Sequence, residues 1–504
     1  MKQILLLIAV ITGLALASCS KTTPDFAKSI PDDAIAVLSL DPMQIHTKGK
    51  LNSFEALKQK AKYEIWKMIL EDPLSTGLML NEYAHVFMTM EEEAPVFGVV
   101  AGMKSVEKFE STLNRIKEEA TADFTEMEGY TYYRPDNEGV IAWNQEQMVV
   151  LSSPDSNEFE ESYWTASLDW MFHPVKEESI VSLVDFKDYQ GKLKDINLWL
   201  SAGDMQKIVE QFAKEKINEL PVSLTNNYSH IYCDFADGAM YISGETNLSE
   251  EVQKNIDEVV VMNPSLNKDI LKMAPGGDLL VALAVSMDLE KLQALMEKYA
   301  PSDLGGVGDK VENATGIPSK ELLNAFTGEF TLAVNALEGE AMIPVELFIG
   351  FGVYSDEIQK QLMETVEGMV PVEEQGDFFV INIQGTEIYS GIVNDTWVIT
   401  NVKGYKDEVS DGELDRSLLD SRFDDFADGS MGMYMNLDME SYPVMVQELL
   451  KQKPEQKKWI EQVTDPFDYF GISAGDQQSM MTLKTNKPGE NSLYTILKIT
   501  ESGN

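Results

Sequence analysis

The chain has 504 residues, of which 40 are Lys or Arg and 84 are Asp or Glu, so its formal charge is −44. With an apolar share of 44% and only two cysteines, the composition excludes a disordered acidic tail and a disulfide-stapled scaffold. Nucleic acid is excluded as a partner because phosphate binding depends on clustered Lys and Arg. We therefore expect a folded acidic protein with enough chain for more than one domain.

Residues 1–18 have the pattern of a secretory signal peptide, with a short positive start and a long apolar run. The run ends in Leu16-Ala17-Ser18-Cys19, which resembles the bacterial lipobox, where signal peptidase cuts before the cysteine. The resemblance implies a diacylglyceryl group on Cys19 and acyl chains such as palmitate, which anchor a mature chain to a membrane. Residues 19–28 then form a tether. An ordinary signal peptide with an incidental cysteine is the alternative.

The residues after Cys19 predict which membrane receives the protein. Ser20 and Lys21 follow the cysteine, and no Asp comes directly after it. By resemblance to the best-known sorting rule, this favours the outer membrane over retention in the inner membrane. Surface-export signals of Bacteroidetes lipoproteins are acidic just after the cysteine, and this segment matches them weakly. We therefore expect a protein anchored in the outer membrane, and we favour its periplasmic face over the cell surface.

An internal repeat divides the remaining chain. A strand, an acidic turn, a second strand and a helix are predicted in this order over 82–109, and the order returns about 250 residues later over 329–358. Further matches follow in sequence toward the end of each half. We therefore expect an internal duplication into two similar domains, 29–262 and 263–504, that meet near Asn263.

The strand pattern predicts the fold class. Strands that alternate apolar and polar residues and meet at tight turns indicate an α+β fold with largely antiparallel sheets, each with one face covered by helices. Four strands are each followed by an aspartate and an amphipathic helix, and these aspartates are Asp41, Asp204, Asp288 and Asp438. A carboxylate in this position caps the first turn of a helix. We interpret the four aspartates as helix caps, with a shared ligand site as the alternative.

No complete catalytic or metal-binding motif occurs in the sequence, so we predict no catalytic residue, no metal site and no cofactor. Met431, Met433 and Met435 share one strand face and would suit Cu(I), but core packing is the favoured interpretation. Ser473 lies in a Gly-x-Ser-x-Gly pattern, but we expect a hairpin there instead of a nucleophile elbow. Cys233 is expected to be a small apolar side chain in a strand.

The start of the mature chain carries a family resemblance. The lipobox, the short polar tether and the segment from Ile30 to Val37 that leads to Asp41 resemble the start of uncharacterised Bacteroidetes cell-envelope lipoproteins. The resemblance implies an envelope lipoprotein with an α+β body, built on a domain of unknown function. It implies no activity and no catalytic residues.

Two functions fit this pattern. The favoured one is a non-enzymatic binding or scaffold lipoprotein, whose partner is an envelope protein, a peptide or a glycan. Trp164, Trp170 and Phe172 are the candidates for a partner patch, but packing onto the first domain is the favoured interpretation of these residues. The other function is an envelope hydrolase that uses Asp or Glu carboxylates, which for a glycosidase lie about 5 to 9.5 Å apart in a pocket. The lack of clustered catalytic side chains favours the binding protein.

Overall fold

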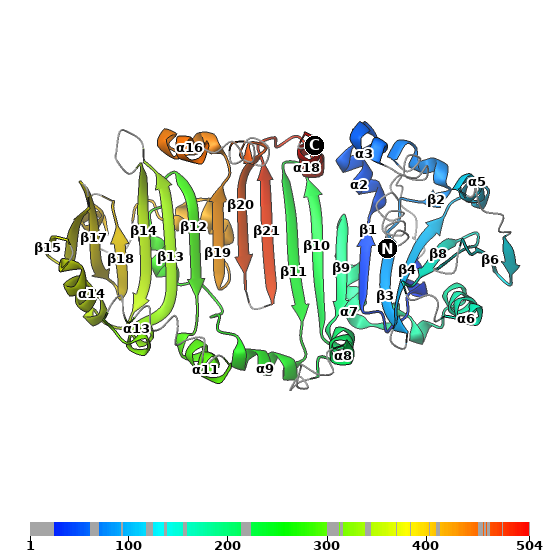
Figure 1. Ribbon diagram of the computed structural model, residues 1–504, viewed down its shortest axis with the longest axis horizontal. Coiled ribbons are helices and arrows are strands. Elements are labelled where there is room, and N and C mark those ends of the chain that lie inside the picture. Colours follow the sequence, from blue (N-terminus) through cyan, green and yellow to red (C-terminus); the bar gives the residue numbers. More distant parts are fainter. Residues whose placement is uncertain are drawn as a thin grey trace. The chain divides into compact units, whose positions relative to one another are not determined.

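The computed structural model describes residues 25–502 except for 61–69, 92–93, 117–123, 136–138, 155–158, 213–222, 300–311, 313–315, 338–343, 369, 384, 403, 410–413, 452–456, 458–459, 461–463 and 476. Two compact units divide the chain. Unit 1 contains Met1–Val252 together with Pro488–Asn504, and unit 2 contains Gln253–Lys487. Each unit is a mixed structure of helices and strands built on an antiparallel sheet (Figure 1).

Unit 1 begins with a short helix and ends with the last helix of the chain. Its elements are η1 (Phe26–Ser29), β1 (Ala36–Leu40), α2 (Pro42–Gly49), η2 (Leu51–Ser53), α3 (Glu55–Lys60), η3 (Pro73–Thr76), β2 (Leu78–Met79), β3 (Ala84–Glu91), β4 (Ala94–Met103), α5 (Val106–Ile116), β5 (Thr125–Met127), β6 (Tyr130–Tyr133), β7 (Gly139–Trp143), β8 (Gln147–Ser152), α6 (Glu161–Phe172), η5 (Lys176–Glu178), η6 (Ile180–Ser182), α7 (Val184–Gln190), β9 (Ile196–Ser201), α8 (Ala202–Phe212), β10 (Tyr228–Ala236), β11 (Ala239–Asn247) and α18 (Ser492–Ser502). Helix α9 (Glu250–Val259) leads into unit 2.

The sheet of unit 1 has the strand order β5-β6-β7-β8-β4-β3-β1-β9-β10-β11, and all of these neighbours are antiparallel. Successive residues of a strand point to opposite faces of the sheet. Val37 and Leu38 of β1 therefore pack in the cores on opposite faces. One face is covered by α6 and α7, and the other by α2, α5 and α18. The sheet therefore carries helices on both faces, where the sequence predicted a single covered face.

Unit 2 repeats this strand order with its own strands. Its sheet is arranged as β15-β16-β17-β18-β14-β13-β12-β19-β20-β21, again antiparallel throughout. Its elements are α10 (Lys268–Met273), β12 (Leu279–Ser286), α11 (Leu289–Tyr299), α13 (Ser319–Ala325), β13 (Phe326–Ala336), β14 (Val345–Val353), α14 (Glu357–Glu367), β15 (Val372–Gln375), β16 (Phe378–Ile383), β17 (Thr386–Val393), β18 (Thr396–Thr400), α15 (Tyr405–Glu408), η7 (Leu418–Asp420), η8 (Arg422–Phe426), β19 (Met431–Asn436), η9 (Met439–Ser441), α16 (Val444–Lys451), β20 (Phe467–Ala474) and β21 (Gln478–Thr485).

The two faces of the unit 2 sheet differ in burial. One face contributes Phe348 and Tyr434 to a core closed by α10, α15, η7 and η8. The opposite face carries a half-buried apolar surface, which we call the methionine face, and it lies outside the core clusters of the described residues. Its members are Val281, Leu283, Val285, Leu332, Val334, Met431, Met433, Met435 and Ile472. The prediction that the methionines pack in the core is therefore wrong, because Tyr434 takes the core face of β19.

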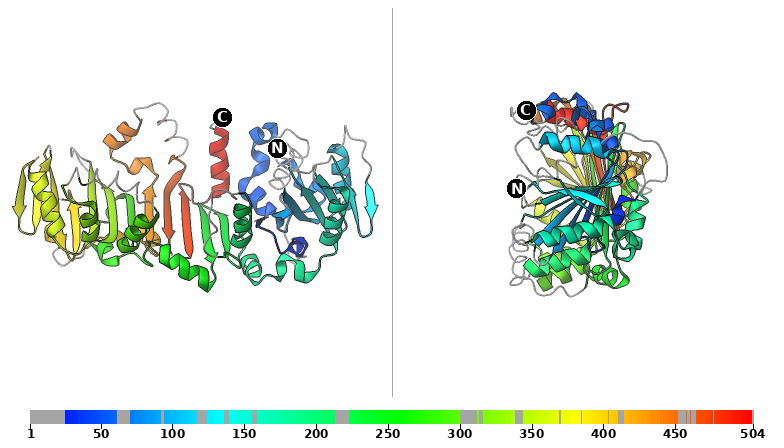
Figure 2. Two further views of the ribbon diagram at one scale, coloured as in Figure 1. Left: turned by 60° about the horizontal axis from the view of Figure 1, so that its bottom comes forward. Right: turned by 90° about the vertical axis from the view of Figure 1, so that its right-hand side faces the viewer.

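The last helix of the chain belongs to unit 1. In α18, Leu493 and Leu497 lie within about 3 Å of the position that a Cβ on Gly49 of α2 would take, and Tyr494 meets Phe54 edge to face at 5.7 Å. The left view of Figure 2 shows α18 beside α2. The units therefore differ from the predicted ranges 29–262 and 263–504 at both borders. Phe26 and Ala27, which fall in the predicted tether, are buried in the core of unit 1.

Candidate functional site

The main candidate site is a cavity of about 1280 Å³ in unit 2. It lies at one end of the sheet, where β12 begins at Leu279, β13 ends at Ala336 and β19 ends at Asn436. The first turn of α16, a helix that Figure 1 labels, also contributes residues to the lining. Twenty-one described residues line this cavity, and they come from segments far apart in the sequence.

A close backbone contact places Arg416 at the cavity. Gly276 N donates a hydrogen bond to the carbonyl oxygen of Arg416 at 3.1 Å. A Cβ on Gly276 would lie 1.8 Å from the carbonyl oxygen of Ser417, so only glycine permits this approach. The Arg416 side chain is exposed and has no recorded hydrogen bond or ion pair with any described residue. As far as the described residues go, its guanidinium is therefore available to a ligand.

Arg422 lines the same cavity but is held in place. One of its terminal nitrogens donates to Asp468 Oδ1 at 2.7 Å, and the side chain also bonds to the hydroxyl of Tyr434. Its guanidinium carbon lies 5.3 Å from the ring centroid of Tyr469. Because a guanidinium has five N–H donors, these contacts orient Arg422 and still leave donors for a further acceptor.

Three of the five carboxylates in the cavity lining already have protein donors. Asp420 accepts hydrogen bonds from Ser417 N and Oγ at 2.9 and 2.8 Å, and these bonds lower the pKa of Asp420. Asp438 caps η9 by accepting from the backbone N of its second residue at 3.1 Å. Asp468 pairs with Arg422. The other two, Asp278 and Glu440, are exposed.

Part of the cavity lining is apolar. Val444 is 71% exposed and Met445 is 50% exposed, and both lie in the first turn of α16. Leu337 and Pro344 also line the cavity. Large apolar side chains exposed at a cavity are typical of a surface that contacts a partner or ligand. The cavity thus combines an available guanidinium with exposed apolar groups.

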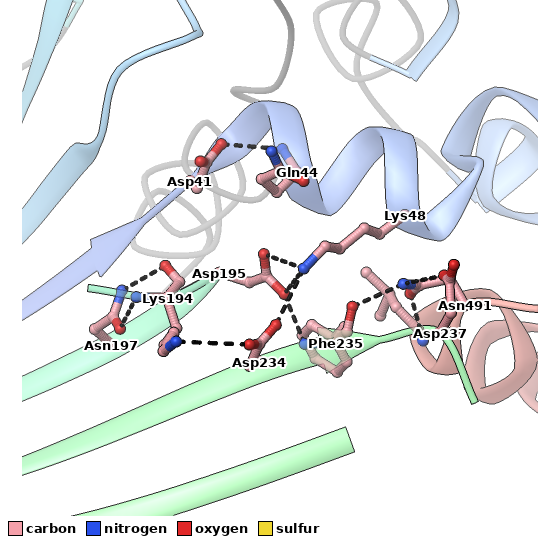
Figure 3. Close-up of polar contacts among 11 residues, drawn as sticks. Asp41, Gln44, Lys48, Lys194, Asp195, Asn197, Asp234, Phe235, Asp237 and Asn491 are labelled. Atoms are coloured by element: carbon pink, nitrogen blue, oxygen red, sulfur yellow. Dashed lines mark hydrogen bonds and ion pairs between the residues drawn. The ribbon is translucent and has the colours of Figure 1, made fainter. Parts of the chain in front are cut away.

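A second polar cluster lies in unit 1 around Lys48 of α2 (Figure 3). Lys48 Nζ donates to both oxygens of Asp195 at 2.8 and 2.7 Å and to Asp234 at 3.2 Å. Burial alone would lower the pKa of Lys48, but these two carboxylates outweigh it and raise that pKa. The Asp195 side chain is only 4% exposed. The cluster therefore fixes α2 to β9 and β10 and presents no open charge to a substrate.

A buried serine–histidine pair in unit 1 also lacks access. Ser39 Oγ lies 2.9 Å from His85 Nδ1, and the hydroxyl of Tyr189 donates to Ser39 Oγ at 3.0 Å. All three side chains are buried. Burial lowers the pKa of His85 to about 4, so the ring is neutral at physiological pH. This pair resembles a nucleophile and base, but no substrate reaches it.

Asp185 lines a smaller cavity of about 560 Å³ in unit 1. It accepts hydrogen bonds from His230 Nε2 at 2.8 Å, Trp199 Nε1 at 2.8 Å and Asn247 Nδ2 at 2.6 Å. Burial raises the pKa of Asp185, but these donors outweigh it and lower the pKa overall. The carboxylate is therefore occupied by protein donors, and the cavity of unit 2 is the better candidate.

The predicted partner patch does not form an exposed surface. Trp164 is 1% exposed and belongs to the core of unit 1. Trp170 and Phe172 are half-buried against that core, and Phe172 stacks on Tyr130 with ring centroids 4.7 Å apart. The aromatic rings of α6 follow the apolar face of the helix, which packs on the sheet. The favoured interpretation, packing onto the first domain, describes these three residues correctly.

Three of the four predicted helix caps are confirmed. Asp41 accepts from Gln44 N at 3.0 Å, Asp288 accepts from Lys291 N at 2.9 Å, and Asp438 caps η9. Asp204 is wrong as a cap because α8 begins at Ala202 and Asp204 lies inside it. There, Ser201 Oγ accepts from Asp204 N.

The remaining predicted positions have the following outcomes. Cys19 lies outside the described residues. Ser473 is in β20, which forms a hairpin with β21 as predicted. Cys233 lies in β10 and is half-buried, and burial together with Asp195 and Asp234 raises the pKa of its thiol to about 11. It is therefore an unreactive thiol.

Sequence reasoning missed Arg416 and Arg422. Composition contains a signal for them, because the chain has only four arginines and two of them stand within seven residues of each other. Both line the cavity of unit 2. A scarce residue type that clusters in the sequence would therefore have marked this site.

Among the described residues, no group of three or more His, Cys, Asp or Glu side chains is placed to hold a metal ion. The helices that the structure describes include none with the length and apolarity of a membrane span.

A family described as a domain of unknown function, DUF4836, matches residues 26–493. No curated protein matches the chain significantly. Two solved structures of TP0453 are similar at low identity. Crystal form III shares 10% identity with a TM-score of 0.29, covering 49% of this chain and 91% of that chain. Crystal form I shares 12% identity with a TM-score of 0.27, covering 48% and 87%.

Proposed function

Since the chain belongs to the DUF4836 family, whose description assigns no activity, we propose a function from the chain's own chemistry: it is a lipid-anchored cell-envelope protein that binds a ligand without transforming it. The cavity of unit 2 is the binding site. The observation that carries this proposal is that the exposed Arg416 and the exposed Val444 and Met445 line the same cavity of about 1280 Å³. This volume exceeds the roughly 300 to 1,000 Å³ of typical small-molecule sites, so the cavity has room for such a ligand.

Binding is favoured over hydrolysis because the groups suited to chemistry are occupied or inaccessible. Ser39 and His85 are buried, and the Cys233 thiol has a raised pKa. Three of the five carboxylates in the cavity lining accept hydrogen bonds from protein donors. The anchor is the acylated Cys19 at the end of the signal peptide, in the outer membrane with its periplasmic face favoured. Envelope proteins, peptides and glycans remain candidate partners of the anchored protein.

The proposal includes an origin by internal duplication. The identical strand order of the two sheets supports it, since ten antiparallel strands in one order are unlikely to arise twice by chance. The cavity then belongs to the second copy, whose Arg416 and Arg422 have no arginine counterpart in the cavity of unit 1 described above. If the two copies have diverged in this way, only unit 2 is expected to bind the ligand.

Mass spectrometry tests both parts of this function. Under denaturing conditions, the chain purified from envelopes should carry the mass of acyl chains, and Cys19→Ala should lack it while Cys233→Ala keeps it. Under native conditions, the unacylated Cys19→Ala chain, purified without detergent, should retain a non-covalent ligand. Adding Met445→Asp should reduce the retained fraction, because a charge replaces an apolar wall of the cavity.

The matched control for the cavity is Met480→Asp in the same chain. Met480 is 38% exposed on β21 and does not line the cavity. It should leave ligand retention unchanged. Equal loss in both variants, or a chain without any retained ligand, would contradict the binding function. An acyl mass that persists in Cys19→Ala would contradict the anchor.

A further inference from the structure

We propose that the cavity of unit 2 binds an amphiphile with a single anionic head, a carboxylate or phosphate monoester on an apolar chain, through Arg416 and Arg422. This inference deepens the proposed function and rests on it, because it names the ligand class of the same cavity. The shared chemistry is one compact anion joined to one apolar body. Each part of the ligand has a counterpart in the lining.

The distribution of arginine in the chain supports an anionic head group. The chain has four arginines among 504 residues, yet two of the twenty-one lining residues are arginine. About one residue in six of the whole chain is acidic against about one in four of the lining, so acidic residues are only slightly enriched there, far less than arginine. The arginines are therefore the unusual feature of this cavity. Arginine presents a planar fork that matches carboxylate and phosphate oxygens.

The existing hydrogen bonds decide which charges are open. Arg422 is oriented by Asp468 and Tyr434, and Arg416 has no recorded partner among the described residues that line the cavity. Asp420 lies between the two arginines in sequence, but its carboxylate already accepts two hydrogen bonds from Ser417 at 2.8 and 2.9 Å. Asp468 already accepts a hydrogen bond from Arg422 at 2.7 Å. An anion that reaches Arg416 therefore finds N–H donors that no acceptor of the described residues occupies.

The apolar residues of the lining support an apolar alkyl chain in the ligand. Val444 and Met445 are exposed at the start of α16, and Leu337 and Pro344 line the same cavity. Burying an apolar chain against such groups is favourable because it removes apolar surface from water. The net charge of −44 disfavours polyanions. A ligand with one anionic head and a long apolar body satisfies both conditions.

Calorimetric titration of the unacylated Cys19→Ala chain tests this inference with four probes of equal chain length. Dodecanoate and dodecyl phosphate carry the anionic head, dodecyltrimethylammonium carries a cation, and dodecyl maltoside carries no charge. All are used below their critical micelle concentrations. We expect the two anionic probes to bind most tightly, and the one that binds more tightly identifies the head group. Acetate and inorganic phosphate, which lack the chain, should bind at least tenfold more weakly.

Variants locate the head group. Arg416→Gln should weaken binding of the anionic probe about tenfold, the size of a lost charged hydrogen bond, and leave binding of dodecyl maltoside unchanged. Arg416→Lys keeps the positive charge but loses the planar guanidinium. Its affinity for the anionic probe should lie between those of the Cys19→Ala chain and Arg416→Gln. Arg115→Gln in α5 of unit 1 removes the same charge elsewhere and should have no effect. Because the Arg416 side chain is exposed and forms no hydrogen bond or ion pair with another described residue, these variants should fold.

Several results would overturn the inference. Tighter binding of the cationic probe would mean that Asp278 and Glu440 select the ligand. Equal weakening by Arg416→Gln and Arg115→Gln would mean that the anion responds to overall charge and not to this cavity. Failure of all four probes to bind would exclude the ligand class. In that case a ligand still retained in native mass spectrometry, and lost in Met445→Asp, would leave the binding function standing.

Discussion

At the scale of the residue, His85 links the stability of unit 1 to pH. Its ring is buried, and Ser39 and Tyr189 form a chain of hydrogen bonds that ends on Nδ1. Burial lowers the pKa of His85 to about 4, while the unfolded chain titrates at about 6.5. Between these values the unfolded state binds the extra proton, so stability falls as the pH drops through this window.

The expected loss is about 2 kcal/mol between pH 7 and pH 5. Urea denaturation at the two pH values measures it, and His85→Gln should remove most of this loss. His173 supplies the control, because it is exposed, and His173→Gln should keep the full loss. The account of His85 is contradicted if His85→Gln loses as much stability on acidification as the unmodified chain.

Residue positions differ in how far sequence predicts them. Helix caps are local, so Asp41 and Asp288 were predicted correctly from the residues beside them. Asp204 was not, because Ser201 stands three residues earlier and takes the capping position. Arg416 depends on Gly276, which is 140 positions away in the chain. No local pattern predicts that contact.

At the scale of the element, the Lys48 cluster joins α2 to the sheet. Lys48→Met would leave Asp195 buried without its cation, which costs about 3 to 5 kcal/mol. Unfolding in urea should show this loss, and hydrogen exchange should rise first in α2. At neutral pH the ion pair between Lys48 and Asp195 is intact. Because the pKa of Lys48 is raised in the folded chain, the stability that this ion pair contributes is lost only as the pH rises through the raised pKa of Lys48.

Two further variants separate the ion pair from the loss of packing. Lys48→Met combined with Asp195→Asn should recover much of the loss, because the buried charge is gone while Asn still accepts from Phe235 N. Lys192→Met removes the exposed pair with Glu245 and should cost under about 1 kcal/mol. A cost for Lys48→Met no larger than that for Lys192→Met would contradict the structural role of the cluster.

Element faces show a second limit of sequence reasoning. The period of two correctly predicted that Met431, Met433 and Met435 share one face of β19. It did not show which face is the core, because Tyr434 makes the opposite face apolar as well. Burial depends on where α10, η7 and η8 pack. That information is tertiary and absent from the strand.

At the scale of the whole molecule, the sequence predicts the order of strands and helices along the chain, but it does not predict the borders of the two units. The repeated pattern of strand, turn, strand and helix matches β3–β4–α5 and β13–β14–α14. The C-terminal helix α18, however, belongs to unit 1, since Leu493 and Leu497 contact Gly49 and its neighbours. The cavity joins residues from Gly277 to Asp468. Both features depend on contacts between distant segments.

The most direct measurement is a crystal structure of the unacylated Cys19→Ala chain with 12-bromododecanoate, whose bromine gives an anomalous signal. We predict one dominant site in unit 2, with the carboxylate bonded to Arg416 and Arg422 and the bromine against the apolar lining near Val444 and Met445. A fully occupied ligand elsewhere, or an empty cavity at a concentration where calorimetry shows saturation, would contradict the account.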